Sequence, residues 1–126
     1  IERPGYFYAA TVLTNIAPGS RVLTEEIFGP VAPIVIFDKE EEAIHHANDT
    51  EYGLVAYVFT RDLARGLRVS EKIESGMIGL NRGLVSDPAA PFGGVKQSGI
   101  GREGGDYALD FYSDLKTLQV ADGTTS

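Results

Sequence analysis

Hydrophobic and polar positions change their spacing several times along the first half of the chain, and each change predicts an element. Residues 8–16 are rich in β-branched and aromatic side chains and are followed by Pro-Gly, which predicts a strand and a turn. Residues 31–37 are apolar throughout, which is typical of a strand covered on both faces. Glutamates and periodic apolar residues then predict a helix over about 39–48, with Asp38 as its N-cap.

The second half repeats this order of elements. Residues 55–60 predict a strand, Asp62 begins a second helix that Gly76 is placed to end, and residues 77–80 predict a further strand. Three side chains of this helix lie at helical spacing and are expected to share one face: Leu63, Leu67 and Ser70. The order strand, helix, strand implies right-handed parallel crossovers, so the predicted fold class is α/β, with a mostly parallel sheet and flanking helices.

The pattern dissolves after residue 80. Residues 81–104 carry glycine, proline and polar residues without periodicity, and a long loop of this kind in a compact domain is usually functional. Residues 106–112 predict one or two helical turns, and residues 114–120 alternate imperfectly between apolar and polar, which indicates a strand. The small polar residues 121–126 predict a flexible tail.

Composition narrows the class of protein. A chain of 126 residues is long enough for one compact unit, and its net charge of −7 argues against a nucleic-acid partner. The longest apolar run, residues 31–37, falls far short of the roughly 20 residues that span a bilayer, so no membrane segment is expected and a cytoplasmic location is the default. Because the chain starts at Ile1 and its only methionine is internal, we expect that it was cut from something longer.

Two motifs identify a resemblance. Residues 25–30 read Glu-Glu-Ile-Phe-Gly-Pro, and residues 91–103 read Pro-Phe-Gly-Gly-Val-Lys-Gln-Ser-Gly-Ile-Gly-Arg-Glu. Both resemble signatures of aldehyde dehydrogenases, and the similarity extends over residues 5–120. It implies the C-terminal portion of the catalytic domain and a cofactor that is NAD or NADP. These enzymes need a cysteine thiolate, and the chain has no cysteine. We therefore expect no catalytic residue in this chain and no activity of the chain alone.

The resemblance gives roles to two residues of the first motif. Glu26 would hold the hydroxyls of the nicotinamide ribose, and Phe28 would pack against the ribose and the nicotinamide. The alternative is an exposed glutamate pair and a core phenylalanine, which the residue types alone would favour.

The loop before the second motif carries the most selective similarity. Its Asn-x-Gly-Leu-x-Ser sequence, residues 81–86, resembles succinate-semialdehyde dehydrogenases within the larger family. That similarity implies that Ser86 binds the distal carboxylate of an aldehyde substrate, and that Phe92 forms a wall of the substrate tunnel. A hydroxyl is a suitable donor to a carboxylate. The alternatives are that residues 86–88 are merely a turn and that Phe92 is a core residue.

Two further patterns are set aside. Residues 99–104 match the Gly-x-Gly-x-x-Gly of dinucleotide-binding folds, but no apolar strand leads into these glycines. The family resemblance instead makes them backbone turns, with Arg102 and Glu103 in structural roles. His45 and His46 are adjacent on a helix and therefore diverge, so no metal site is expected.

The resemblance also implies a domain organisation. Residues 1–111 would belong to the catalytic domain, with a substrate loop over 81–98, and residues 112–120 would form an oligomerisation strand that makes a homo-oligomer. Two alternatives stay open at this point. The chain is part of an aldehyde dehydrogenase with another substrate, or it is a non-catalytic interaction or dimerisation module on the same scaffold.

Overall fold

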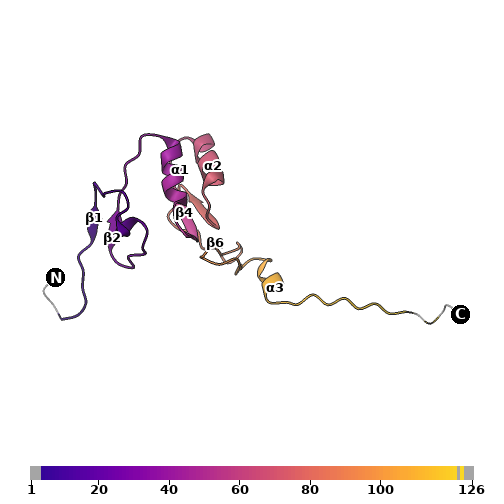
Figure 1. Cartoon of the computed structure of the whole chain (residues 1–126). Helices are drawn as coiled ribbons and strands as arrows, with labels where there is room; N and C mark the ends of the chain where they lie inside the picture. The colour runs from indigo at the N-terminus through magenta and orange to yellow at the C-terminus, as the bar shows by residue number, and fades with distance from the viewer. Residues whose placement is uncertain (1–3, 122, 124–126) are drawn as a thin grey trace. The chain divides into compact units, whose positions relative to one another are not determined.

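The computed structural model describes residues 4–121 and 123, which divide after Thr50 into two compact units and not the one unit that the chain length predicts. In the N-terminal unit, strand β1 (Thr11–Leu13) pairs in parallel with β2 (Val31–Pro33), with Thr11 opposite Val31. Figure 1 shows these two strands side by side. A short 3-10 helix, η1 (Arg21–Leu23), lies in the connection between them, and helix α1 (Glu40–Asn48) follows.

Both strands of this unit are shorter than their apolar sequences predict. After β2, the backbone N–H of Ile34 still donates to the carbonyl of Leu13 at 2.9 Å, and no further strand residue follows. The expectation that residues 31–37 are covered on both faces is wrong for this unit, since Ile36 is 80% exposed and Phe37 54%. The length of a strand depends on the partner that pairs with it, and β1 offers three residues.

Helix α1 confirms the predicted helix to within one residue, but its N-cap is Lys39 and not Asp38. The carboxylate of Glu42 reaches back instead and accepts hydrogen bonds from the backbone N–H groups of Asp38 at 3.1 Å and Lys39 at 3.4 Å. This contact satisfies N–H groups at the helix start that have no partner within the helix. It replaces the predicted aspartate cap.

The C-terminal unit contains the predicted strand-helix-strand arrangement. Strand β4 (Val55–Val58), helix α2 (Leu63–Lys72) and strand β5 (Met77–Leu80) follow one another, and β4 pairs in parallel with β5 from Val55 opposite Met77. The carboxylate of Asp62 accepts a hydrogen bond from the N–H of Arg65 at 3.0 Å, which confirms the predicted N-cap. The α/β class is therefore confirmed.

Helix α2 differs from the prediction in which residues face the sheet and in where the helix ends. Leu63 is 64% exposed and Leu67 53%, whereas Gly66 is buried. A Cβ atom on Gly66 would lie 2.8 Å from Cδ1 of Leu80, so the helix approaches β5 through this glycine. The helix ends at Lys72, with Ile73 as its C-cap, and does not extend to Gly76.

Two short elements complete the C-terminal unit. Strand β3 (Tyr52–Gly53) pairs antiparallel with β6 (Val95–Lys96), which the sequence pattern does not predict, and α3 spans Ala108–Phe111. Met77 is the one buried large hydrophobic residue among those described. Within the described part of the chain, no helix is long and apolar enough to cross a membrane.

The strand predicted over residues 114–120 does not form in the single chain. Figure 1 shows the segment after α3 as an extended trace, and Leu115 is 104% exposed and Leu118 80%. A strand needs a partner for its backbone hydrogen bonds, and none pairs with this segment among the described residues. Of the predicted tail, residues 122 and 124–126 lie outside the described residues.

Candidate functional site

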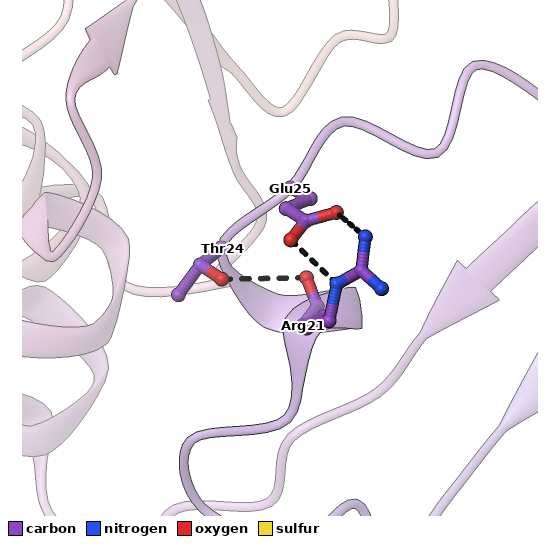
Figure 2. Close-up of polar contacts among 3 residues, drawn as sticks. All are labelled: Arg21, Thr24 and Glu25. Atoms are coloured by element: carbon purple, nitrogen blue, oxygen red, sulfur yellow. Dashed lines mark hydrogen bonds and ion pairs between the residues drawn. The ribbon is translucent and has the colours of Figure 1, made fainter.

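The first motif forms a turn that is built by local contacts. The guanidinium of Arg21 binds the carboxylate of Glu25 through two bonds, from Nε to Oε1 at 2.6 Å and from Nη2 to Oε2 at 2.7 Å (Figure 2). The hydroxyl of Thr24 donates to the carbonyl of Arg21 at 3.4 Å, and the N–H of Glu25 donates to the same carbonyl at 2.8 Å. Glu25 is therefore tied to the 3-10 helix.

The two glutamates of the motif differ in their partners. The hydrogen bond from Arg21 lowers the pKa of Glu25, and it raises the pKa of Arg21. Glu26 is exposed, and its carboxylate has no polar partner among the described residues. Its two oxygens are therefore available as hydrogen-bond acceptors, as the predicted role of a ribose clamp requires.

Phe28 is held out from its unit. It is 92% exposed, and its φ of 48° lies in the left-handed region, which is uncommon for a residue with a bulky side chain. It borders a hollow of about 660 Å³ together with an aromatic cluster and the adjoining turn: Tyr6, Phe7, Tyr8, Ile27, Gly29, Pro30 and Val31. The alternative of a core phenylalanine is wrong for this unit, because the ring is not buried.

In the C-terminal unit, the loop that carries Ser86 leaves the end of β5 at Asn81. The Oδ1 atom of Asn81 accepts a hydrogen bond from the N–H of Thr60 at 2.9 Å, and Nδ2 donates to the carbonyl of Thr60 at 2.9 Å. The N–H of Asn81 donates to the carbonyl of Val58 at 2.8 Å. These contacts join the carboxyl ends of β4 and β5, where parallel sheets commonly place their functional loops.

The hydroxyl of Ser86 takes no part in the turn that follows it. Asp87 accepts two hydrogen bonds, from the N–H of Ala89 to Oδ1 at 2.9 Å and from the N–H of Ala90 to its carbonyl at 3.0 Å. The turn therefore spans residues 87–90 and not the predicted residues 86–88. Ser86 itself is exposed, and its hydroxyl has no partner among the described residues. The turn therefore does not use the hydroxyl that the resemblance assigns to the substrate.

Phe92 is fixed through its backbone. Its N–H donates to the carbonyl of Glu103 at 2.7 Å, and the N–H of Glu103 donates back at 2.8 Å. The side chain is 37% exposed, so it is not a core residue, and it lines a hollow of about 390 Å³ that Phe111 and Tyr112 also border. A ring whose backbone is held and whose face is open can form the wall of a pocket.

Arg102 holds the two glycine-rich turns of the second motif together. Its Nη1 donates to the carbonyls of Gly94 at 2.6 Å, Gly101 at 2.8 Å and Ile100 at 3.3 Å. The structural role that the resemblance gives to Arg102 agrees with these contacts. Each of the three carbonyls would lose a charge-assisted hydrogen bond if the guanidinium were removed.

Glycines allow this loop to lie against the rest of its unit. A Cβ atom on Gly76 would collide with the backbone of Gly93, and one on Gly53 would lie 2.7 Å from the carbonyl oxygen of Glu74. In addition, Ser98 Oγ accepts a hydrogen bond from the N–H of Gly53 at 3.0 Å. The packing role of Gly76 was not predicted, because a glycine just after a helical pattern is also the ordinary sign of a helix end.

The patterns set aside in the sequence have no functional geometry in the described residues. The Gly-x-Gly-x-x-Gly segment follows a two-residue antiparallel strand, and Gly99 and Gly104 have φ values of 93° and 67°. The rings of His45 and His46 lie 5.8 Å apart and tilted by 42°, and no group of three potential metal ligands occurs in the described part of the chain.

The chain is similar to known proteins over most of its length. The model of the aldehyde dehydrogenase family matches residues 1–118. A succinate-semialdehyde dehydrogenase of Paenarthrobacter nicotinovorans is 52% identical over 122 residues, 97% of this chain and 27% of the relative. A glutarate-semialdehyde dehydrogenase of Pseudomonas aeruginosa is 47% identical over 114 residues, 90% of this chain and 24% of that relative.

A solved structure gives the same result at the level of the backbone. The NAD+ complex of an aldehyde dehydrogenase from Bacillus cereus superposes with a TM-score of 0.90 and 44% identity, covering 95% of this chain and 24% of that one. The chain thus spans about a quarter of the length of the relatives that it matches.

Proposed function

The chain belongs to the aldehyde dehydrogenase family, and on that premise we propose that it is the part of an NAD(P)-dependent enzyme that contacts the cofactor ribose and the distal carboxylate of the substrate. The proposed reaction is oxidation of succinate semialdehyde to succinate. The observation that carries this proposal is the exposed hydroxyl of Ser86, which has no partner among the described residues and lies beside a turn made by Asp87.

The residues of the first motif fit a nicotinamide dinucleotide. Glu26 offers an exposed carboxylate without a polar partner among the described residues, and it would accept hydrogen bonds from the ribose hydroxyls. Phe28 presents its ring beside the hollow of the N-terminal unit and would pack against the ribose and nicotinamide. When bound, the cofactor accepts the hydride that leaves the aldehyde. The proposed cofactor is NAD or NADP.

The residues of the loop fit a substrate with a charged end. The hydroxyl of Ser86 would donate to the distal carboxylate, and the half-exposed ring of Phe92 would limit the pocket on one side. Phe92 suits this part because its backbone is held by two bonds to Glu103 and its ring lines a hollow.

The chain lacks the nucleophile that the proposed reaction needs. Thioester chemistry on an aldehyde needs a thiolate, and the 126 residues contain no cysteine, so the polypeptide by itself is expected to be inactive. We propose that residues 112–120 pair with a second subunit and so make a homo-oligomer, because their apolar side chains are exposed and no strand pairs with them among the described residues. A cytoplasmic location also remains a prediction.

Glutarate semialdehyde is the second candidate substrate. The Pseudomonas aeruginosa relative that is 47% identical is named for it. It carries the same distal carboxylate with one more methylene group, a difference that a pocket discriminates only weakly. Both candidates predict the same role for Ser86.

The test of this function is the substitution Ser86→Ala in the complete enzyme that the proposal implies. Loss of a charge-assisted hydrogen bond should raise KM for succinate semialdehyde about tenfold, and should change KM much less for an uncharged aldehyde of similar length. The matched control is Ser75→Ala, because the Ser75 hydroxyl donates to the carbonyl of Met77 at 3.2 Å and lies outside the loop that carries Ser86. Equal changes for both aldehydes in Ser86→Ala would remove Ser86 from substrate recognition.

A further inference from the structure

Asn81 combines a strained backbone with a side chain that completes a strand pair. Its φ of 54° lies in the left-handed region. Its amide exchanges two hydrogen bonds with the backbone of Thr60, both at 2.9 Å, one as acceptor and one as donor. In an antiparallel pair a strand residue forms such a reciprocal pair with its backbone, but β4 and β5 are parallel. The N–H of Asn81 makes the last backbone bond to β4, at the carbonyl of Val58, and the side chain then bonds Thr60 while the backbone turns away from the sheet.

A second observation shows where the backbone goes. A Cβ atom on Gly79 would lie 3.0 Å from the carbonyl oxygen of Arg82 and 2.6 Å from the ring of Tyr57. The chain therefore folds back over β5 directly after Asn81, and it passes so close that position 79 has no room for a side chain. The left-handed conformation of Asn81 produces this reversal.

Among the described residues, hydrogen bonds hold the loop beyond this point only at its two ends. Residues 82–86 make no hydrogen bond to any other described residue. The next anchor is the Asp87 turn, where the carbonyl of Pro88 accepts from the N–H of Gly105 at 3.1 Å. Ser86 lies at the end of this free stretch. Its position therefore depends on the exit direction at Asn81 and on the Asp87 turn.

We propose that Asn81 is a positioning residue that sets the exit direction of the loop and thereby places the Ser86 hydroxyl for the substrate carboxylate. The inference rests on the proposed function of Ser86. Asn81 contacts no substrate in this account. It acts through the amide bonds to Thr60 and through its left-handed backbone, and the two contributions are separable by substitution.

The test compares three variants of the complete enzyme. Asn81→Gly keeps access to positive φ and removes both amide bonds. Asn81→Asp keeps the acceptor for the N–H of Thr60 but places a second oxygen against the carbonyl of Thr60. The matched control is Asn15→Gly, because Asn15 has a nearly identical φ of 53° and lies in the N-terminal unit, outside the loop and outside the residues assigned to the cofactor.

Asn81→Gly and Asn81→Asp should each raise KM for succinate semialdehyde about tenfold, with much smaller changes in kcat and in KM for an uncharged aldehyde, since small displacements of a binding group have effects of this size. Asn15→Gly should leave both KM values unchanged. In the same samples, amide hydrogen exchange at Thr60 should accelerate in Asn81→Gly, because its acceptor is gone.

Two results would overturn the inference. In the first, Asn81→Gly accelerates exchange at Thr60 but leaves KM unchanged for both aldehydes. In the second, KM rises equally for the charged and the uncharged aldehyde, which indicates a general structural role. Ser86→Ala, measured in parallel, tests the proposed function of Ser86 separately from the positioning role of Asn81. If it loses selectivity for the carboxylate while Asn81→Gly does not, the function of Ser86 stands and the role of Asn81 fails.

Discussion

The two motifs of this chain are stabilised in opposite ways. The turn of residues 25–30 is held mainly by contacts within a few residues, such as the bidentate pair of Arg21 and Glu25, and only the carbonyl of Pro30 accepts from a distant residue, Thr11, among the described backbone bonds. The glycine-rich loop of residues 91–103 is held by contacts across long stretches of sequence, such as Gly76 against Gly93 and Ser98 to Gly53. The first turn presents side chains outward, whereas the second forms a backbone framework. Substitutions in the two regions should therefore be detected by different measurements.

The largest effect is expected in the framework, from Gly76→Ala. The new methyl group would collide with the backbone of Gly93, which cannot move aside like the end of a flexible side chain. Overpacking of this kind should destabilise the fold by about 3 kcal/mol. Thermal unfolding measures the change. Gly83→Ala is the control, since a Cβ atom there meets no atom within 4 Å. Similar stabilities of the two variants would contradict the close backbone contact.

The next effect is expected at the outward-facing turn, from Glu26→Gln. If Glu26 accepts the ribose hydroxyls, loss of its charge should raise KM for the cofactor about tenfold while unfolding stays nearly unchanged. Glu25→Gln is the matched control, because the Glu25 carboxylate already binds Arg21. The assignment of Glu26 would be wrong if both variants raised KM for the cofactor equally.

The smallest effect is expected for Arg21→Gln, as a dependence of stability on pH. The pKa of Glu25 is lowered in the folded chain by its bond to Arg21, so the pair stabilises the fold above the ordinary glutamate pKa. That contribution is lost as pH falls through the lowered value. The difference in stability between the parent and Arg21→Gln should therefore be present near neutral pH and vanish in acid. Both side chains are exposed, so salt should reduce it further.

A pH-independent difference would argue against the ion pair as its source. The pair would then contribute through packing of the 3-10 helix and not through charge. The turn of the first motif would still be built mainly from local contacts, but the charges of Arg21 and Glu25 would not contribute to its stability.

Local signals in the sequence predicted the elements that depend on local contacts. Asp62 caps α2 as predicted, and residues 77–80 form a strand with the predicted bounds, because a cap and a short apolar run are each encoded within a few residues. The β3–β6 pair was not predicted, since it joins two dipeptides about forty residues apart that have no periodicity of their own. The end of β2 was missed for the same reason, because its length depends on β1.

The candidate site also contains residues that the sequence predicts and residues whose roles depend on distant contacts. Four residues were identified through the family resemblance, and the structure leaves all four accessible to some degree: Glu26, Phe28, Ser86 and Phe92. Their roles remain predictions. Gly76 was predicted only as a helix end and Asn81 only as part of the loop motif, because their contacts with Gly93 and with Thr60 arise only in the folded chain.

The most direct test of the central claim is a chimera. This chain would replace the matching segment of the Paenarthrobacter nicotinovorans enzyme, to which it is 52% identical, and kcat/KM for succinate semialdehyde would be measured with NAD and with NADP. The account predicts activity within about tenfold of the unaltered enzyme, a preference over an uncharged aldehyde that Ser86→Ala abolishes, and no activity of the 126-residue chain alone. A folded chimera that oxidises no aldehyde, or that prefers the uncharged one, would contradict it.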